Sequence, residues 1–285
     1  RKDNADDSDK DRKVSGNAVL SFQNAFRSAC PAGLPAVAVI SCDSTDFDQA
    51  IIMTTAIYFH PICQLHEMGA HHPESPARMK TMMNAFRESG LDRILEYRLS
   101  PESTERDIRR VHTQDMINKA KDNIPEPGDY YPLDETPLNH YSWKAALRTT
   151  GAALAATDAV LSGEIRNAFC IERPIGHHST IGEAMGFCVF NSLAIAAMHA
   201  IKERKLERVA IVDIDVHHGN GTEDIFSYEP SVLMVSYYQQ YLYPFCGNEK
   251  ERANMVNVPV PPGTGGDVIR RVVTEKWLPA LHRHK

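Results

Sequence analysis

The sequence predicts a three-layer α/β/α domain built around a mainly parallel sheet. From Asn167 onward, strand-like and helix-like segments alternate, which is typical of parallel strands joined by helical crossovers. The 285 residues are 42% hydrophobic, enough to bury one substantial core. We therefore expect a single domain whose reactive groups gather at the carboxyl ends of its strands.

The expected elements follow the hydrophobic pattern. A strand rich in β-branched and aromatic residues is predicted over 54–59, where the domain begins at about residue 53. Helices are predicted over 76–89, where apolar residues recur at helical spacing, and over the alanine-rich stretch 142–163. The second half predicts strands 167–171, 209–214 and 232–236, and helices 191–204 and 267–281.

Residues 1–52 are predicted to be an atypical, partly disordered extension of a domain that spans 53–285. Arg1–Lys13 is mostly charged and has no apolar anchor to offset its ordering entropy. Val14–Ala50 has short apolar patches without a helical or strand period, so we assign it no structure.

The overall charge and the cysteines exclude several classes of function. A net charge of -6 gives no general attraction to nucleic acid. The six cysteines lack paired metal spacing and are expected to be reduced packing residues. No apolar run is long enough to span a bilayer, and the charged start does not resemble a signal peptide. We expect a cytoplasmic protein, or a nuclear one in a eukaryote, with no membrane partner and with homo-oligomerisation left open.

The clearest chemical pattern follows the predicted strand 209–214. Strand alternation predicts that Asp213, Asp215 and His217 point to one side. Two carboxylates and an imidazole need a compensating cation, and zinc accepts this ligand set. A helix-capping or ion-pair cluster is the alternative.

A second pattern, Gly176-His177-His178, follows strand 167–171 and should open onto the same edge of the sheet from a neighbouring strand. Adjacent histidines in a loop after a glycine can move protons near neutral pH. A structural or surface histidine pair is the alternative.

These motifs resemble those of the histone deacetylase and acetylpolyamine amidohydrolase family, which shares its fold with arginases. The resemblance covers about Met53 to Leu281, and Leu65–Gly69 and His72–Arg78 are similar to the family's first active-site loop. The motifs appear in the family's order: Gly176-His177-His178, Gly186–Asn191, Asp213–Gly221 and Pro262–Gly265.

The resemblance implies a zinc ion bound by Asp215 and His217. It also implies a proton-transfer pair, His177 and His178, with Asp213 orienting the first and Asn220 behind the second. Many family members have aspartate where this sequence has Asn220, so His178 should be less basic.

The resemblance further implies an acyl-lysine tunnel lined by Gly186 and walled by Phe187 and Tyr243, although core packing is the alternative for both rings. Asp134 would grip the substrate backbone, or would be a solvated loop carboxylate.

Two further implied roles concern ions and product release. Ser236 would help to hold a structural potassium ion near Asp213 and Asp215. Arg78 would line an acetate exit channel, or would pair with a carboxylate.

The implied activity is zinc-dependent removal of acetyl groups from acetyl-lysine in proteins such as histones, or from related acetylated amines. The family's third zinc ligand, in a segment resembling Ala-Gly-Phe-Asp-Ala-His, does not occur before Lys285, and neither does its oxyanion-stabilising tyrosine or histidine. We therefore expect a deacetylase domain truncated at its C-terminus, with an incomplete sheet, weak zinc binding and little turnover. A catalytically impaired interaction module is the alternative. An arginase-type ureohydrolase is disfavoured, because this sequence lacks the Ser-x-Asp-x-Asp pattern that such an enzyme needs for its metal site.

Overall fold

The computed structural model describes residues 18–20, 39–42, 54–247 and 252–285. They contain an eight-stranded sheet with the order β10-β9-β8-β1-β2-β7-β3-β4. Five of its seven pairings are parallel and two, β1 with β2 and β2 with β7, are antiparallel. The predicted α/β class with a mainly parallel sheet is confirmed. The predicted disorder of Arg1–Lys13 lies outside the described residues.

The predicted strands at 54–59, 167–171, 209–214 and 232–236 are confirmed within a few residues. A separate two-stranded sheet pairs β5 (Tyr131–Leu133) with β6 (Thr136–Leu138). The strands of the main sheet are β1 (Ala18–Leu20), β2 (Val39–Cys42), β3 (Thr55–Phe59), β4 (Leu95–Leu99), β7 (Asn167–Ile171), β8 (Val209–Asp213), β9 (Val232–Gln239) and β10 (Met255–Val260).

The predicted helices are also present. The one expected over 267–281 is divided, because a π-helical segment, Val273–Trp277, joins α7 to α8. The helices are α1 (Ala77–Glu88), α2 (Glu105–Ile108), α3 (Gln114–Asp122), α4 (Ser142–Leu161), α5 (Ser192–Lys202), α6 (Asn220–Phe226), α7 (Gly266–Val272) and α8 (Leu278–His284).

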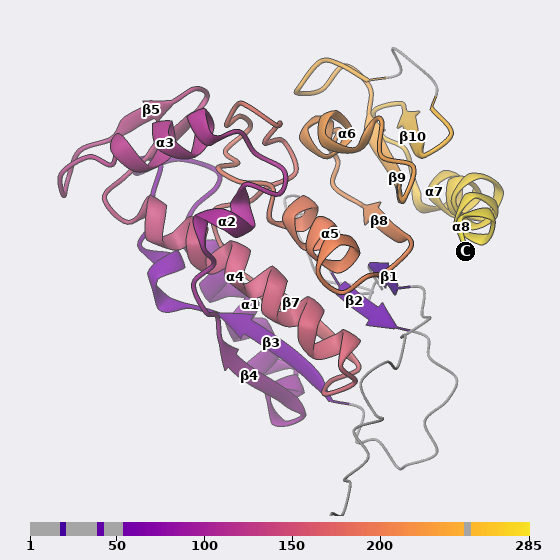
Figure 1. Ribbon diagram of the computed structural model, residues 1–285, viewed down its shortest axis with the longest axis horizontal. Coiled ribbons are helices and arrows are strands. Elements are labelled where there is room, and N and C mark those ends of the chain that lie inside the picture. Colours follow the sequence, from indigo (N-terminus) through magenta and orange to yellow (C-terminus); the bar gives the residue numbers. More distant parts are fainter. Residues whose placement is uncertain (1–17, 21–38, 43–53, 248–251) are drawn as a thin grey trace, which may run out of the picture.

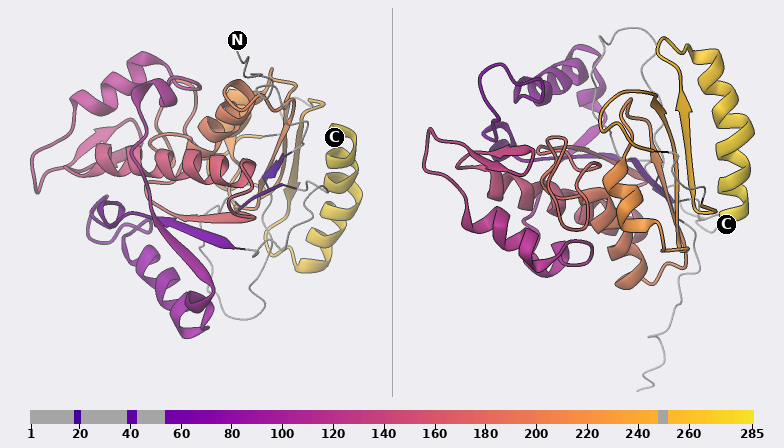
Figure 2. Two further views of the ribbon diagram at one scale, coloured as in Figure 1. Left: turned by 60° about the horizontal axis from the view of Figure 1, so that its bottom comes forward. Right: turned by 90° about the horizontal axis from the view of Figure 1, so that it is seen from above.

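Helices lie on both faces of the main sheet (Figures 1 and 2). Alternate side chains of a strand pack against the two helical layers. In β3, Ala56 and Tyr58 join the core that contains α4 and α5, whereas Ile57 packs with Phe86 of α1 on the opposite face. In β8, Ile211 joins the first core, and Val212 packs with residues of α7, α8 and the segment between them. The central strands are therefore buried on both faces, as expected for a sheet between two helical layers.

Strands β1 and β2 lie between the two strands that lead to the predicted site. β1 is parallel to β8, and β2 is antiparallel to β7. The sequence analysis predicted that β7 and β8 are neighbours in the sheet. This prediction is wrong, because β1 and β2 lie between them. The division into an extension at 1–52 and a domain at 53–285 stays a prediction.

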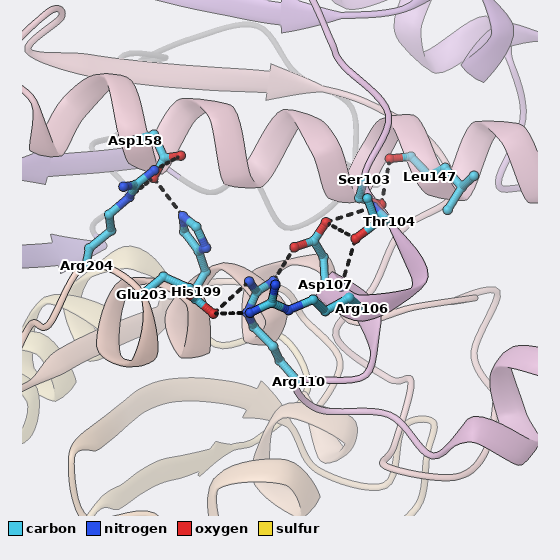
Figure 3. A network of polar contacts seen from close by, with 10 residues as sticks. All are labelled: Ser103, Thr104, Arg106, Asp107, Arg110, Leu147, Asp158, His199, Glu203 and Arg204. Atoms are coloured by element: carbon cyan, nitrogen blue, oxygen red, sulfur yellow. Dashed lines mark hydrogen bonds and ion pairs between the residues drawn. The ribbon is translucent and has the colours of Figure 1, made fainter.

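A polar network fastens the helices of one layer to each other (Figure 3). Asp158 of α4 accepts hydrogen bonds from Arg204 and lies 2.7 Å from Nε2 of His199 on α5. Burial would raise the pKa of Asp158, but His199 and Arg204 outweigh burial and hold that pKa below its ordinary value. Arg110 joins Asp107 of α2 to Glu203 after α5. In the described part of the chain, no helix is long and apolar enough to cross a membrane.

Candidate active site

The loops that follow β7 and β8 bring the predicted histidines and aspartates together. His177 Nδ1 lies 2.9 Å from Asp213 Oδ2, and the ring centres of His177 and His178 are 4.0 Å apart. The ring of His217 is centred 5.8 Å from that of His178. The cluster therefore forms even though β7 and β8 are not neighbours in the sheet.

Two successive turns, and not strand alternation, position Asp215 and His217. The strand β8 ends at Asp213. The backbone N–H of Asp215 then donates to Asp213 Oδ1 at 3.0 Å, and that of His217 donates to Asp215 Oδ1 at 2.8 Å. His217 Nδ1 consequently lies 2.9 Å from Asp215 Oδ1, so a carboxylate oxygen and an imidazole nitrogen face each other.

The fit of this pair to zinc is partial. Carboxylate oxygen and imidazole nitrogen are donors that zinc accepts, and the Asp215 side chain is only 10% exposed. However, the described residues contain no group of three or more histidine, cysteine, aspartate or glutamate side chains that could hold a metal ion. Asp215 and His217 thus match zinc in ligand type but supply two donors.

The bond between His178 and Asn220 fixes the proton on the imidazole. His178 Nδ1 lies 2.8 Å from Asn220 Oδ1, and an amide oxygen can only accept, so Nδ1 donates. In the neutral ring, Nε2 is then the free acceptor. Burial and the neighbouring charge of His177 lower the pKa of His178 to about 2, so this ring is neutral.

His177 has the opposite electrostatics. Burial alone would lower its pKa, but the carboxylates of Asp213 and Asp215 outweigh burial and raise the pKa of His177 to about 9. The adjacent histidines therefore form a charged proton donor beside a neutral proton acceptor, which is a suitable pair for acid–base chemistry.

Two glycines permit close packing around His178. A Cβ at Gly186, whose φ is +56°, would lie 2.3 Å from Cδ2 of His178. A Cβ at Gly221, in the first turn of α6, would lie 2.3 Å from the carbonyl oxygen of Ser179. Larger residues would push the loop and helix away from the imidazole.

The two predicted tunnel aromatics flank this cluster. The ring centre of Tyr243 lies 5.0 Å from that of His178. Phe187 follows Gly186, and its ring centre lies 4.2 Å from that of His72. Both rings are partly exposed, which favours the tunnel over core packing. Their role as tunnel walls stays a prediction.

Asp134 is engaged by the protein itself. Its carboxylate pairs with Lys119 and accepts the backbone N–H of Ala184 at 3.1 Å. The next residue, Glu135, was missed by sequence reasoning, and it accepts a hydrogen bond from the Tyr243 hydroxyl at 2.5 Å. Substrate gripping by Asp134 stays a prediction.

Comparisons with known proteins assign the sequence to a family. Residues 72–285 match the family model described as the histone deacetylase domain. The chain belongs to the histone deacetylase family. The chain is 33% identical, over 255 residues, to the histone deacetylase-like amidohydrolase of Pseudomonas aeruginosa, and the match covers 81% of this chain and 67% of that protein.

Two further comparisons extend the match. A probable deacetylase of Archaeoglobus fulgidus is 35% identical over 242 residues, which cover 82% of this chain and 66% of that protein. The crystal structure of the HDA15 HD domain superposes with a TM-score of 0.71 and 30% identity, covering 80% of this chain and 68% of that one. The chain thus spans about two thirds of the length of these relatives.

A buried ion pair, missed by sequence reasoning, fastens the first loop of the candidate site. Arg173 is 1% exposed, and its Nε and Nη2 each donate to the Glu74 carboxylate at 2.5 Å. Its Nη1 donates to the carbonyl oxygens of Cys63 and His66. Glu74 also accepts from Arg78 at 2.8 Å, so the prediction that Arg78 pairs with a carboxylate is confirmed.

Ser236 lies directly across from Asp213 in the register of β8 and β9. Its hydroxyl donates to Asn257 Oδ1 at 2.7 Å, which leaves the lone pairs of the Ser236 oxygen available to a cation. The potassium role of Ser236 and Asp213 stays a prediction.

The buried carboxyl of Glu172 predicts a pH dependence of stability. Burial raises the pKa of Glu172 to about 7, although Cys63 and Ser100 lie against the carboxyl and act to lower the pKa. An acid whose folded-state pKa is raised stabilises the fold below its ordinary pKa of 4.5, and this contribution is lost as the pH rises through 7. Glu172→Gln should remove that loss and raise the free energy of unfolding at pH 8 by about 3 kcal/mol.

Urea unfolding of both proteins at pH 5 and pH 8 measures this difference. Glu88→Gln, an exposed change in α1, is the control and should not alter the pH dependence. Equal pH dependence in the wild type and in Glu172→Gln would contradict the prediction.

Proposed function

We propose that this domain is a zinc-dependent hydrolase that removes acetyl groups from acetyl-lysine side chains of proteins, or from related acetylated amines. The observation that carries the proposal is the packing of two adjacent imidazoles, His177 and His178, beside the facing pair Asp215 and His217. Membership of the histone deacetylase family supports the same reaction class.

In the proposed reaction, Asp215 and His217 would hold the zinc ion. When bound, zinc supplies a Lewis acid that polarises the acetyl carbonyl and lowers the pKa of water toward about 7. His178 accepts a proton from the attacking water at Nε2, because Asn220 keeps the other ring proton on Nδ1. His177 gives a proton to the departing amine, and Asp213 stabilises the charge on its ring.

The remaining residues would bind the substrate and shape the site. Phe187 and Tyr243 would enclose the methylene stem of the acylated amine, with Gly186 letting the loop that carries Phe187 pack closely against His178. A potassium ion near Asp213 and Ser236 would brace the end of β8.

A second candidate function is an interaction module that binds an acylated amine without hydrolysing it. The observation that favours it is the presence of only two zinc donors, Asp215 and His217, in the part of the chain that the structure describes. This module would use the same tunnel.

A labelled acetyl group distinguishes the two candidates. With zinc and a peptide that carries tritiated acetyl-lysine, the wild type should release acetate at least ~100-fold faster than His177→Ala, because general acid–base catalysis contributes 10²–10⁴-fold. Peptide binding without acetate release would favour the interaction module. Neither binding nor release would contradict both candidates.

A further inference from the structure

The strand β4 forms one edge of the main sheet, far from the strands that lead to Asp215 (Figure 1). It pairs with β3 on one side, and no other described segment pairs with its second side. The backbone N–H of Ser100, directly after β4, donates to a carbonyl oxygen of β3 at 3.0 Å, so the even-numbered residues of β4 direct their backbone groups toward β3. The N–H and C=O groups of Leu95, Tyr97 and Leu99 therefore point outward, where a further strand can pair with them.

The side chains at this edge are apolar on one face and charged on the other. Leu99 is 65% exposed, and Ile94, directly before β4, is 73% exposed. On the other face, Arg98 Nη2 lies 2.7 Å from Glu96 Oε1. Native proteins usually protect an open edge with lysine, proline or a bulge, because such an edge is a template for pairing with another chain. The strand β4 contains no lysine or proline, and its pairing with β3 has no bulge.

The sequence of β4, Leu-Glu-Tyr-Arg-Leu, is complementary to itself in the antiparallel direction. With Tyr97 opposite its own copy, each Leu95 lies opposite a Leu99, so the outward backbone groups meet as hydrogen-bonded pairs. Each Glu96 then lies opposite an Arg98, in the pairs whose side chains are closest.

Other antiparallel registers of two β4 strands are unfavourable. A slip of two residues places Glu96 opposite Glu96, or Arg98 opposite Arg98, and like charges that face each other are destabilising. A slip of one residue sets the outward backbone groups of one strand against the inward groups of the other, so the hydrogen bonds are lost. The strand therefore specifies a single register for pairing with its own copy.

We propose that β4 pairs with β4 of a second copy of this chain, so that the two main sheets join across a two-fold axis at Tyr97. A two-fold interface requires a surface that is complementary to itself, and β4 meets this requirement in its backbone groups, its charges and its apolar side chains. In strand addition of this kind, main-chain hydrogen bonds supply affinity and side chains supply specificity. The pairing uses none of the loops that form the candidate active site.

Sedimentation equilibrium of the full chain tests the pairing. The wild type should form a dimer at about 100 µM protein, a high concentration chosen because small interfaces associate weakly. Glu96→Arg sets two arginines opposite each other on both sides of the axis and should weaken the dimer at least ~10-fold. Arg98→Glu should weaken it as much, through two pairs of glutamates. An equimolar mixture of the two variants restores opposite charges in every pair and should form the dimer again.

Controls separate pairing from general charge effects and from damage to the fold. Glu126→Arg makes the same change of charge at an exposed loop position and should leave the dimer unchanged. Circular dichroism checks that each variant folds, because Arg98 also pairs with Glu164 of its own chain. If Arg98→Glu fails to fold, Tyr97→Pro takes its place. Proline at this position removes an N–H that points outward, keeps the pairing with β3, and should also give a monomer.

Three results would overturn the inference. A wild type that stays monomeric at this concentration would show that the edge remains unpaired. A dimer that both Glu96→Arg and Tyr97→Pro leave intact would assign the contact to another surface of the molecule. Two folded charge variants that fail to associate when mixed would refute the register centred on Tyr97.

Discussion

Alanine at Asp215 should weaken zinc binding by at least ~100-fold, more than the 10–100-fold typical of partners that only orient a metal ligand. The carboxylate is one of two donors that face each other at 2.9 Å, and the same carboxylate accepts the backbone N–H of His217 in the turn that presents the imidazole. Loss of this carboxylate leaves a single imidazole, which cannot hold a divalent ion against water. Zinc calorimetry on the variant and the wild type measures the change.

The matched control for Asp215→Ala is Asp267→Ala. Asp267 lies in α7 with its side chain 85% exposed, and its alanine variant should bind zinc as the wild type does. His217→Ala should weaken zinc binding as strongly as Asp215→Ala. Wild-type zinc affinity in either of these two variants would place the ion elsewhere.

Alanine at Glu74 should lower the free energy of unfolding by about 3–5 kcal/mol. Glu74 is 4% exposed and Arg173 is 1% exposed. Without the carboxylate, Nε and Nη2 of Arg173 both lose their hydrogen-bond acceptor. The guanidinium would remain buried and uncompensated, and Arg78 would lose its ion-pair partner as well. Urea unfolding followed by circular dichroism measures the loss.

The controls for Glu74→Ala distinguish loss of the ion pair from loss of volume. Glu67→Ala, an exposed change in the same loop, should alter stability by less than about 0.5 kcal/mol. Replacing both partners, as in Glu74→Leu with Arg173→Met, should recover much of the stability, because an apolar pair carries no desolvation cost. A Glu74→Ala variant as stable as the Glu67→Ala variant would contradict the account.

The buried strands could be predicted from the sequence because runs of apolar, β-branched residues are typical of such strands. Val209–Asp213 and Val232–Gln239 are such runs, and the structure buries most of their side chains. The edge strand Leu95–Leu99 carries Glu96 and Arg98 and is largely exposed, so its pattern is weak. The insertion of β1 and β2 between β7 and β8 depends on pairings between distant segments, which local periodicity does not encode.

The residues that carry the chemistry of the site were easier to predict than the ion pairs and hydrogen bonds that hold its loops in place. His177, His178, Asp213, Asp215 and His217 stand in two short motifs, and the structure brings these motifs together. Glu74 and Arg173 are 99 residues apart, and Glu135 and Tyr243 are 108 apart, so nothing local links the partners. The turns that orient Asp215 and His217 use side-chain oxygens as acceptors, which strand alternation cannot foresee.

The most direct test of the central claim is anomalous diffraction at the zinc edge from crystals soaked in zinc. The account predicts one strong peak within about 2.0–2.2 Å of both an Asp215 carboxylate oxygen and His217 Nδ1, next to the imidazoles of His177 and His178. A peak elsewhere, or no peak in crystals whose His177 and Asp215 keep their positions, would contradict it.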